Sequence, residues 1–196
     1  MKNNDYLLPA IAAIGVAILY PLYWIVVVNL DQFSFTGSFS HSPSVVSSFI
    51  LLAVGTLSFY LYYGFMQLLH DQHDFKGADI ALISILVITV IFYLGTFLLE
   101  LATPWLGEDL VNGLTTWLLI LSIIIYGVVD ILLAIILLRQ RDNLSSLINA
   151  FAIINLIMGI MEVSIIFSFA TLVIFPLVAI VLAMVFLRKP EMIEIV

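Results

Sequence analysis

The sequence predicts an all-α protein, a polytopic bundle of six transmembrane helices that forms a single membrane domain over residues 1–196. Hydrophobic residues make up 64% of the chain, charged residues only 10%, and the mean hydropathy is +1.25. A soluble domain carries about 25% charged residues, because charge keeps its surface hydrated. We therefore expect the exterior of this chain to face lipid, with both termini in the cytoplasm.

Six apolar segments alternate with short polar connections. A span needs about 20 mainly apolar residues to cross a hydrocarbon core about 30 Å thick. The first segment has no small-residue cleavage site before Asn29, so we expect a retained helix and not a signal peptide. The predicted spans are 7–28, 45–69, 79–103, 113–138, 144–163 and 165–187. The polar connections are predicted at 29–44, 70–78, 104–112 and 139–143.

The boundary between the last two spans is the least marked. The stretch from Leu144 to Leu187 is too long for one span at 1.5 Å per residue, yet only Glu162, Ser164 and Ser168 indicate a turn within it. Five spans are the alternative. Six spans place all six basic residues on one side, which the positive-inside rule makes cytoplasmic. These residues are Lys2, Lys76, Arg139, Arg141, Arg188 and Lys189.

These features indicate a multi-pass protein of the cell membrane, inner or plasma. The chain has no cysteine and a formal net charge of -7, which disfavours thiolate chemistry and nucleic-acid partners. It has no HExxH zinc motif, no P-loop, no histidine placed to serve a buried serine, and only one deeply placed aspartate. We predict no cofactor and no enzymatic activity, although an intramembrane enzyme stays an open alternative.

Asp130 is the strongest candidate functional residue. An ionisable group in hydrocarbon costs at least about 2.5–3.5 kcal/mol. Asp130 precedes Arg139 by nine residues, which is about 13 Å of helix. Antiparallel pairing of spans 113–138 and 144–163 brings Asn149 and Asn155 near its level. The functional interpretation is a proton- or cation-binding carboxylate, and the structural alternative is a protonated aspartate joined to Asn155.

Two glutamates end predicted spans on the outer side. Glu100 lies near the end of 79–103, and Glu162 lies at the turn after 144–163. If these helices touch, the two carboxylates share a cation at the outer mouth. The alternative is a pair of interfacial acids that reach into headgroup water.

The densest group of potential metal ligands lies in a predicted cytoplasmic connection. His70 and His73 are three residues apart and would share a helix face, next to Asp71 and Asp74. Neutral imidazole and carboxylate suit Zn²⁺ and similar ions. The alternative is a solvated loop.

Small residues spaced four apart permit close helix approach. They are Ala13 with Ala17 and Ala179 with Ala183, and they serve either internal packing or a partner helix. Six spans, both ends inside, about 200 residues and the Ala13 and Ala17 pair resemble the substrate-binding subunits of energy-coupling-factor vitamin transporters. The resemblance covers this overall plan and these two residues. It implies a membrane partner subunit.

The functional hypothesis is transport or conduction of a small solute or ion, with Asp130 as the intramembrane binding or coupling group. One alternative is a non-catalytic membrane subunit of a larger complex, such as the substrate-binding subunit of a multi-component transporter. Another is a membrane sensor or immunity protein. The expected partners are the lipid bilayer and either further copies of the chain or a membrane partner subunit.

Overall fold

A computed structural model describes residues 6–30, 45–164 and 167–188, and all the elements it describes are helices. Six of these helices are long and apolar enough to cross a membrane, which confirms an all-helical, multi-pass chain. The elements are α1 (Leu7–Leu30), α2 (Val45–His73), α3 (Asp79–Leu101), α4 (Thr103–Leu106), α5 (Glu108–Arg139), α6 (Ser146–Val163), η1 (Ser168–Ala170) and α7 (Thr171–Leu187).

Two helices differ from the predicted spans. Helix α2 continues to His73, so the first part of the predicted connection 70–78 is helical. Asp74, directly after the helix, has a φ of 46°. Helix α5 begins at Glu108, five residues earlier than predicted, after the short helix α4. Gly107, with φ 82°, separates α4 from α5 in a left-handed conformation that favours glycine. Glu108 and Asp109 in the first turn of α5 complement its positive N-terminus.

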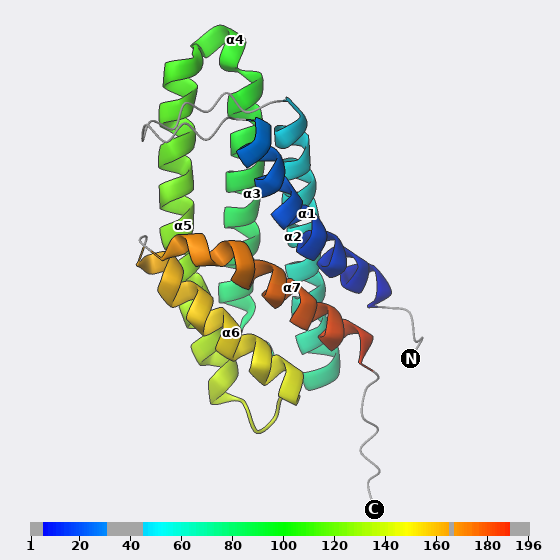
Figure 1. Ribbon diagram of the computed structural model, residues 1–196. Coiled ribbons are helices and arrows are strands. Elements are labelled where there is room, and N and C mark those ends of the chain that lie inside the picture. The colour runs from blue at the N-terminus through cyan, green and yellow to red at the C-terminus, as the bar shows by residue number, and fades with distance from the viewer. Residues whose placement is uncertain (1–5, 31–44, 165–166, 189–196) are drawn as a thin grey trace, which may run out of the picture.

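The six long helices form a closed ring. Each packs against two neighbours in the order α1, α2, α3, α5, α6, α7 and back to α1 (Figure 1). Helix α1 lies between α2 and α7, and α5 lies between α3 and α6. The main core is made by the inward faces of these helices, with Phe65, Phe151 and Leu182 among its fully buried side chains.

The α6–α7 hairpin reaches only part of the way along the bundle. In Figure 1 its turn lies beside the middle of α5, while α4 stands at the far end of the molecule. The first half of α5 therefore contacts mainly α3, and apolar side chains there are exposed, such as Leu114, Trp117 and Leu121. We call the end with α4 the α4 end and the opposite end the Arg139 end.

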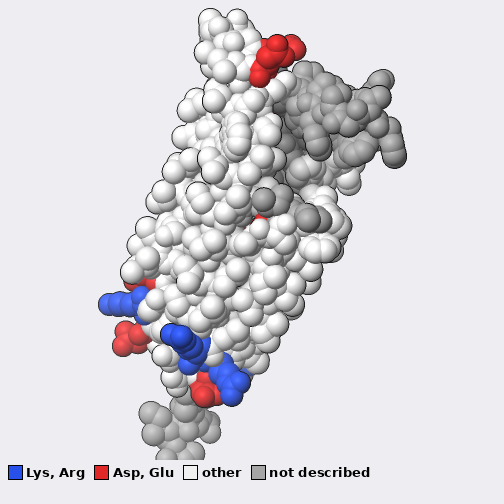
Figure 2. Space-filling view, turned by 90° about the vertical axis from the view of Figure 1, so that its left-hand side faces the viewer, with Lys and Arg blue, Asp and Glu red and all other residues white. Residues whose placement is uncertain are grey.

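Basic side chains gather at one end of the molecule. Figure 2 shows the Lys and Arg side chains at one end, together with acidic side chains, and acidic side chains alone at the other, with a largely uncharged flank between them. The described basic residues belong to the connections and helix termini of the Arg139 end, and they are Lys76, Arg139, Arg141 and Arg188. Lys2 and Lys189 lie outside the described residues.

Candidate intramembrane carboxyl site

The site lies where α5 and α6 approach most closely. A Cβ atom on Gly127 would lie 2.8 Å from the carbonyl oxygen of Gly159, and a Cβ atom on Gly159 would lie 2.7 Å from the carbonyl oxygen of Gly127. No side chain fits there, so only glycine permits this contact between the backbones. The pair fixes the offset of α6 along α5 and places the polar residues of both helices opposite each other.

Asp130 lies three residues after Gly127 and is 2% exposed. Asn155, on the same face of α6 as Gly159, is fully buried and donates from Nδ2 to the Asp130 carboxyl oxygen Oδ1 at 3.2 Å. The same Nδ2 lies 3.1 Å from the backbone carbonyl oxygen of Asp130. The Asn155 amide thus pairs with both the carboxyl group and the backbone carbonyl of Asp130 at the helix interface.

Glu162 completes the site from the next turns of α6. Its side chain is 9% exposed and is a hydrogen-bonding partner of the Asp130 side chain. Two carboxyl groups can hydrogen bond only if one of them carries a proton. Asp130 already accepts from Asn155, whereas no donor reaches Glu162 Oε2 from the described residues. The geometry therefore favours Glu162 as the donor and Asp130 as the acceptor.

Tyrosines surround the two carboxyl groups. Tyr62 of α2 and Tyr126 of α5 lie within electrostatic range of both Asp130 and Glu162, while Tyr93 and Tyr20 lie within range of Glu162. Tyr126 donates to Thr89 Oγ1 at 2.8 Å, and Thr89 donates to the carbonyl of Ile85 at 2.7 Å. These groups are neutral hydrogen-bonding side chains. No Lys or Arg of the described residues pairs with either carboxyl group.

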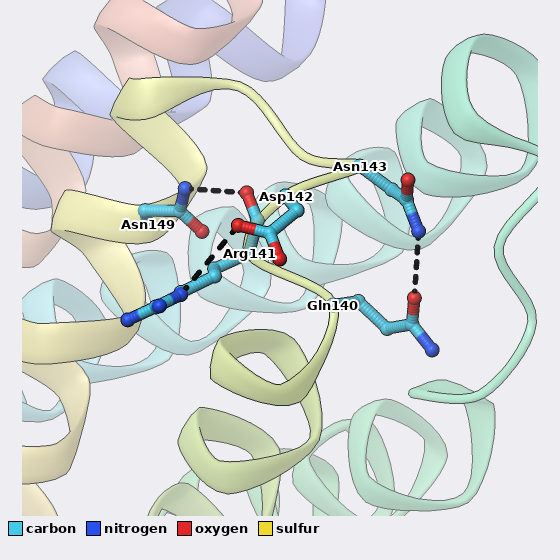
Figure 3. Close-up of polar contacts among 5 residues, drawn as sticks. All are labelled: Gln140, Arg141, Asp142, Asn143 and Asn149. Atoms are coloured by element: carbon cyan, nitrogen blue, oxygen red, sulfur yellow. Dashed lines mark hydrogen bonds and ion pairs between the residues drawn. The ribbon is translucent and has the colours of Figure 1, made fainter.

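Asn149, which the sequence places near Asp130, lies elsewhere. Its Nδ2 donates to the backbone carbonyl of Arg141 at 2.9 Å and closes the connection between α5 and α6. Figure 3 shows this contact beside the Arg141–Asp142 ion pair and the hydrogen bond from Asn143 to Gln140. The expectation that Asn149 lines the site is not met, because Asn149 sits in the first turn of α6, well before Asn155.

Glu100 and Glu162 are not brought together. Glu100 lies in the last turn of α3, next to α4, whereas Glu162 lies beside Gly127 near the middle of α5. A Cβ atom on Gly127 would lie 2.9 Å from Glu162 Cβ. Helix α6 is short and oblique, so its end does not reach the α4 end as the shared outer mouth requires (Figure 1). The predicted shared cation site of these two residues is therefore not formed.

The four potential metal ligands do not form a metal site. His70 Nε2 lies 2.6 Å from Asp79 Oδ1 and links the end of α2 to the start of α3. Asp71 Oδ2 accepts from the Tyr6 hydroxyl at 2.8 Å. Among the described residues, which include His73 and Asp74, no group of three or more His, Asp or Glu side chains could hold a metal ion. His70 and Asp71 therefore connect α2 to neighbouring segments at the Arg139 end.

The small-residue faces pack inside the molecule. Ala13 and Ala179 are fully buried, Ala183 is 5% exposed and Ala17 is partly buried, and α1 packs directly against α7. Of the two interpretations, internal packing is the one these positions support.

Two features of the site escaped the sequence analysis, namely the Gly127–Gly159 contact and the meeting of Glu162 with Asp130. The pattern that could have revealed them is short. Asn155, Gly159 and Glu162 follow each other at intervals of four and three residues, so they share one helix face. Gly127 and Asp130 share a face of α5 in the same way.

No protein-family model matches the chain, and comparisons with curated proteins and with solved structures find no significant match. The candidate site therefore rests on the geometry of this chain alone.

Proposed function

We propose that this protein moves a small solute or ion across the membrane, and that Asp130 and Glu162 together form its proton-binding group. The observation that carries the proposal is the meeting of two carboxyl groups between α5 and α6, in helices long and apolar enough to span a membrane. Ionisable residues in spanning segments are costly and are typical of ion pathways and proton relays.

A proton fits this site better than a metal ion. The Asp130 and Glu162 side chains lie within hydrogen-bonding range of each other, and a hydrogen bond between two carboxyl groups requires a proton. No group of three acidic or imidazole side chains that could hold a metal ion is available in the described chain. Removing the proton leaves two negative charges in contact, which the surrounding apolar medium disfavours. Loss and gain of this proton therefore change the charge of the α5–α6 interface, which is what a coupling group must do.

The charge distribution supports an orientation. The described basic residues gather at the Arg139 end, and Glu108 and Asp109 lie at the α4 end (Figure 2). Under the positive-inside rule the Arg139 end faces the cytoplasm of a cell membrane. In this orientation both termini are cytoplasmic and the α4 end faces outward.

The test is proton uptake into liposomes that contain the purified chain and a lumenal pH-sensitive dye, driven by a valinomycin-clamped potassium potential. We expect the wild-type protein to admit protons well above protein-free liposomes. Asp130→Asn should lower the rate at least about tenfold, since the amide cannot exchange a proton. Exchanging external sodium for an impermeant organic cation at an unchanged potassium gradient tests whether sodium takes the place of the proton.

Asp109→Asn is the matched control, because it makes the same chemical change in an exposed residue at the start of the same helix. It should keep the wild-type rate. Thermal unfolding of each variant separates function from structure. A folded Asp130→Asn protein with wild-type flux, or a wild-type protein without proton uptake, would contradict the proposal. Loss of folded Asp130→Asn protein would favour the structural alternative, in which Asp130 and Asn155 only join two helices.

The main alternative is a non-catalytic subunit of a larger complex. Its support in the sequence was the pair of small-residue faces, and these pack within the chain. No further observation on the described residues favours it. Native mass spectrometry after gentle extraction from the host membrane tests it directly, because a stoichiometric foreign subunit would replace the self-sufficient transporter.

A further inference from the structure

Polar side chains follow the interface between α3 and α5 from the α4 end to the carboxyl pair. On each helix their spacing of four or seven residues places them on one face. We call this set the α3–α5 polar face. It consists of Thr89, Thr96 and Glu100 on α3 and of Thr115, Ser122, Tyr126 and Asp130 on α5.

Two contacts fix how the helices align. Tyr126 donates to Thr89, and a Cβ atom on Gly95 would lie 3.2 Å from the side chain of Leu118. In this antiparallel register Thr115 lies at the level of Glu100, near α4. Thr96 lies about one turn nearer to Asp130, and Ser122 lies between Thr96 and Tyr126. Polar groups therefore recur along the interface as far as Asp130.

Three buried oxygen atoms on this face have no hydrogen-bond partner among the residues that the structure describes. Threonines in a helix usually donate to the carbonyl four residues earlier, as Thr89 does to Ile85 at 2.7 Å and Thr116 does to Asn112 at 2.7 Å. Thr96 Oγ1 and Thr115 Oγ1 make no such bond. Glu100 Oε2 is likewise buried without a partner.

Unpaired buried polar atoms are costly, and each one requires an explanation. Three of the eight such atoms among the described residues belong to α3 and α5 toward the α4 end. Buried polar groups without a protein partner are commonly satisfied by water, which makes about three hydrogen bonds at such positions. Water molecules along this face would satisfy all three atoms.

Between the carboxyl pair and the Arg139 end, the interior is packed with apolar side chains. On the Arg139 side of the carboxyl pair, fully buried apolar residues fill the interior, with Phe65 and Phe151 in edge contact at 4.9 Å between ring centroids. Leu133, Leu137 and Ile148 are fully buried beside them. Among the described residues of this half, no buried polar side chain continues the path beyond Asp130 and Asn155.

We propose that the α3–α5 polar face is a hydrated path that leads protons from the α4 end to the Asp130–Glu162 pair, with Glu100 as its entry group. The path is open on one side only, because the apolar layer of Phe65 and Phe151 blocks the way to the Arg139 end. This inference rests on the proposed function, in that it supplies the route to the proton-binding group. Its hydration is nevertheless testable without any transport.

The test uses single cysteines, and the chain suits it because it contains no cysteine of its own. Thr96→Cys, Thr115→Cys and Ser122→Cys are close in size to the natural residues. Leu121→Cys places a thiol on the exposed apolar flank beside Ser122, and Leu133→Cys places one in the closed layer. Each protein, in lipid nanodiscs, is treated with the cationic reagent 2-(trimethylammonium)ethyl methanethiosulfonate, and its mass is followed over time.

We expect the three polar-face cysteines to react at least about tenfold faster than Leu121→Cys and Leu133→Cys. Methanethiosulfonates react with the thiolate, which forms only where water reaches the sulfur. Ser122→Cys is decisive because it lies deepest along the path. Equal, slow reaction of Ser122→Cys, Thr96→Cys and the two controls, in variants that keep wild-type thermal stability, overturns the proposal.

The two proposals fail in different ways. Rapid labelling without Asp130-dependent proton uptake would keep the hydrated path and contradict the proposed function. Slow labelling with Asp130-dependent uptake would contradict the path alone. Glu100→Gln adds a functional readout, in which we expect proton uptake to fall several-fold, whereas the exposed matched control Glu108→Gln should leave it unchanged. Unchanged uptake in Glu100→Gln would overturn its assignment as the entry group.

Discussion

Helices α3 and α5 run through both halves of the bundle, but their packing is apolar in one half and contains polar side chains in the other. Toward the Arg139 end, α3 and α5 belong to a complete ring and bury leucine and phenylalanine side chains such as Leu82, Leu133 and Phe151. Toward the α4 end, α5 packs mainly against α3, and their interface contains threonine, serine, tyrosine and glutamate. The carboxyl pair lies at the boundary between these halves.

Under the proposed function, this difference in packing would control where protons can pass. Apolar side chains packed without polar partners exclude water. An interface with unpaired hydroxyl and carboxyl groups attracts it. Asp130 and Glu162 lie at the boundary between the apolar packing and the polar interface. Mutations in each half can therefore be tested separately.

The largest effect is expected from weakening the apolar half. Phe151→Ala removes the edge contact with Phe65 and leaves a cavity, for which large-to-small core changes cost about 3–5 kcal/mol. We expect a clear fall in thermal stability and a proton leak that bypasses control by the carboxyl pair. Ile153→Ala, at an exposed position of the same helix, should change neither. A stable Phe151→Ala protein without leak would show that Phe151 is no part of the barrier.

The boundary between the halves is tested by Gly159→Ala. The added methyl group would lie 2.7 Å from the carbonyl oxygen of Gly127, so α5 and α6 must separate. Overpacking of this kind costs about 1–3 kcal/mol. We expect lower thermal stability and weakened Asp130-dependent proton uptake, since Asn155 and Glu162 move away from Asp130 with the helix.

Gly113→Ala is the control for this change. It also lies within a long helix, yet nothing lies within 4 Å of the position of its Cβ atom. Alanine should be neutral or slightly stabilising there, because it is the better helix former. Equal behaviour of the two variants in thermal unfolding would contradict the close contact between α5 and α6.

The smallest effect is expected in the polar half. Tyr126→Phe removes the hydrogen bond to Thr89 and keeps the ring, and such bonds between membrane helices contribute about 0.6 kcal/mol. Thermal stability should barely change, while proton uptake should slow several-fold because a polar group next to Asp130 is lost. Tyr60→Phe, at an exposed position, should leave both measurements at wild-type values. Unchanged uptake in Tyr126→Phe would remove this hydroxyl from the path.

The fold class and the number of membrane-capable helices could be predicted from the sequence because they depend on local hydropathy. A run of apolar residues long enough to span needs no knowledge of its neighbours. Asp130 could be selected as a candidate site residue for the same reason, because a lone carboxyl group within an apolar segment is visible in the sequence itself. Its contact with Asn155 followed from the short connection between α5 and α6.

The meeting of Glu162 with Asp130 could not be predicted, because it depends on the offset and tilt of one helix against another. An ideal upright hairpin sends the end of α6 to the outer side, away from Asp130. The Gly127–Gly159 contact and the oblique course of α6 set a different level (Figure 1). The end of α2 at His73 was missed for a related reason, since the contacts of His70 and Asp71 with neighbouring helices support polar residues in a helical conformation.

The unequal lengths of α5 and α6 also have a consequence for the surrounding lipid. Helix α5, with 32 residues, is about 48 Å long, whereas α6, with 18, is about 27 Å long. One flank is thus longer than an average bilayer is thick, and the other is slightly shorter. Such a hydrophobic mismatch is relieved by tilt or by local thinning of the bilayer. Thinning beside the end of α6 would draw the headgroups toward the level of Glu162, so under the proposed function membrane thickness would set how far a proton must travel.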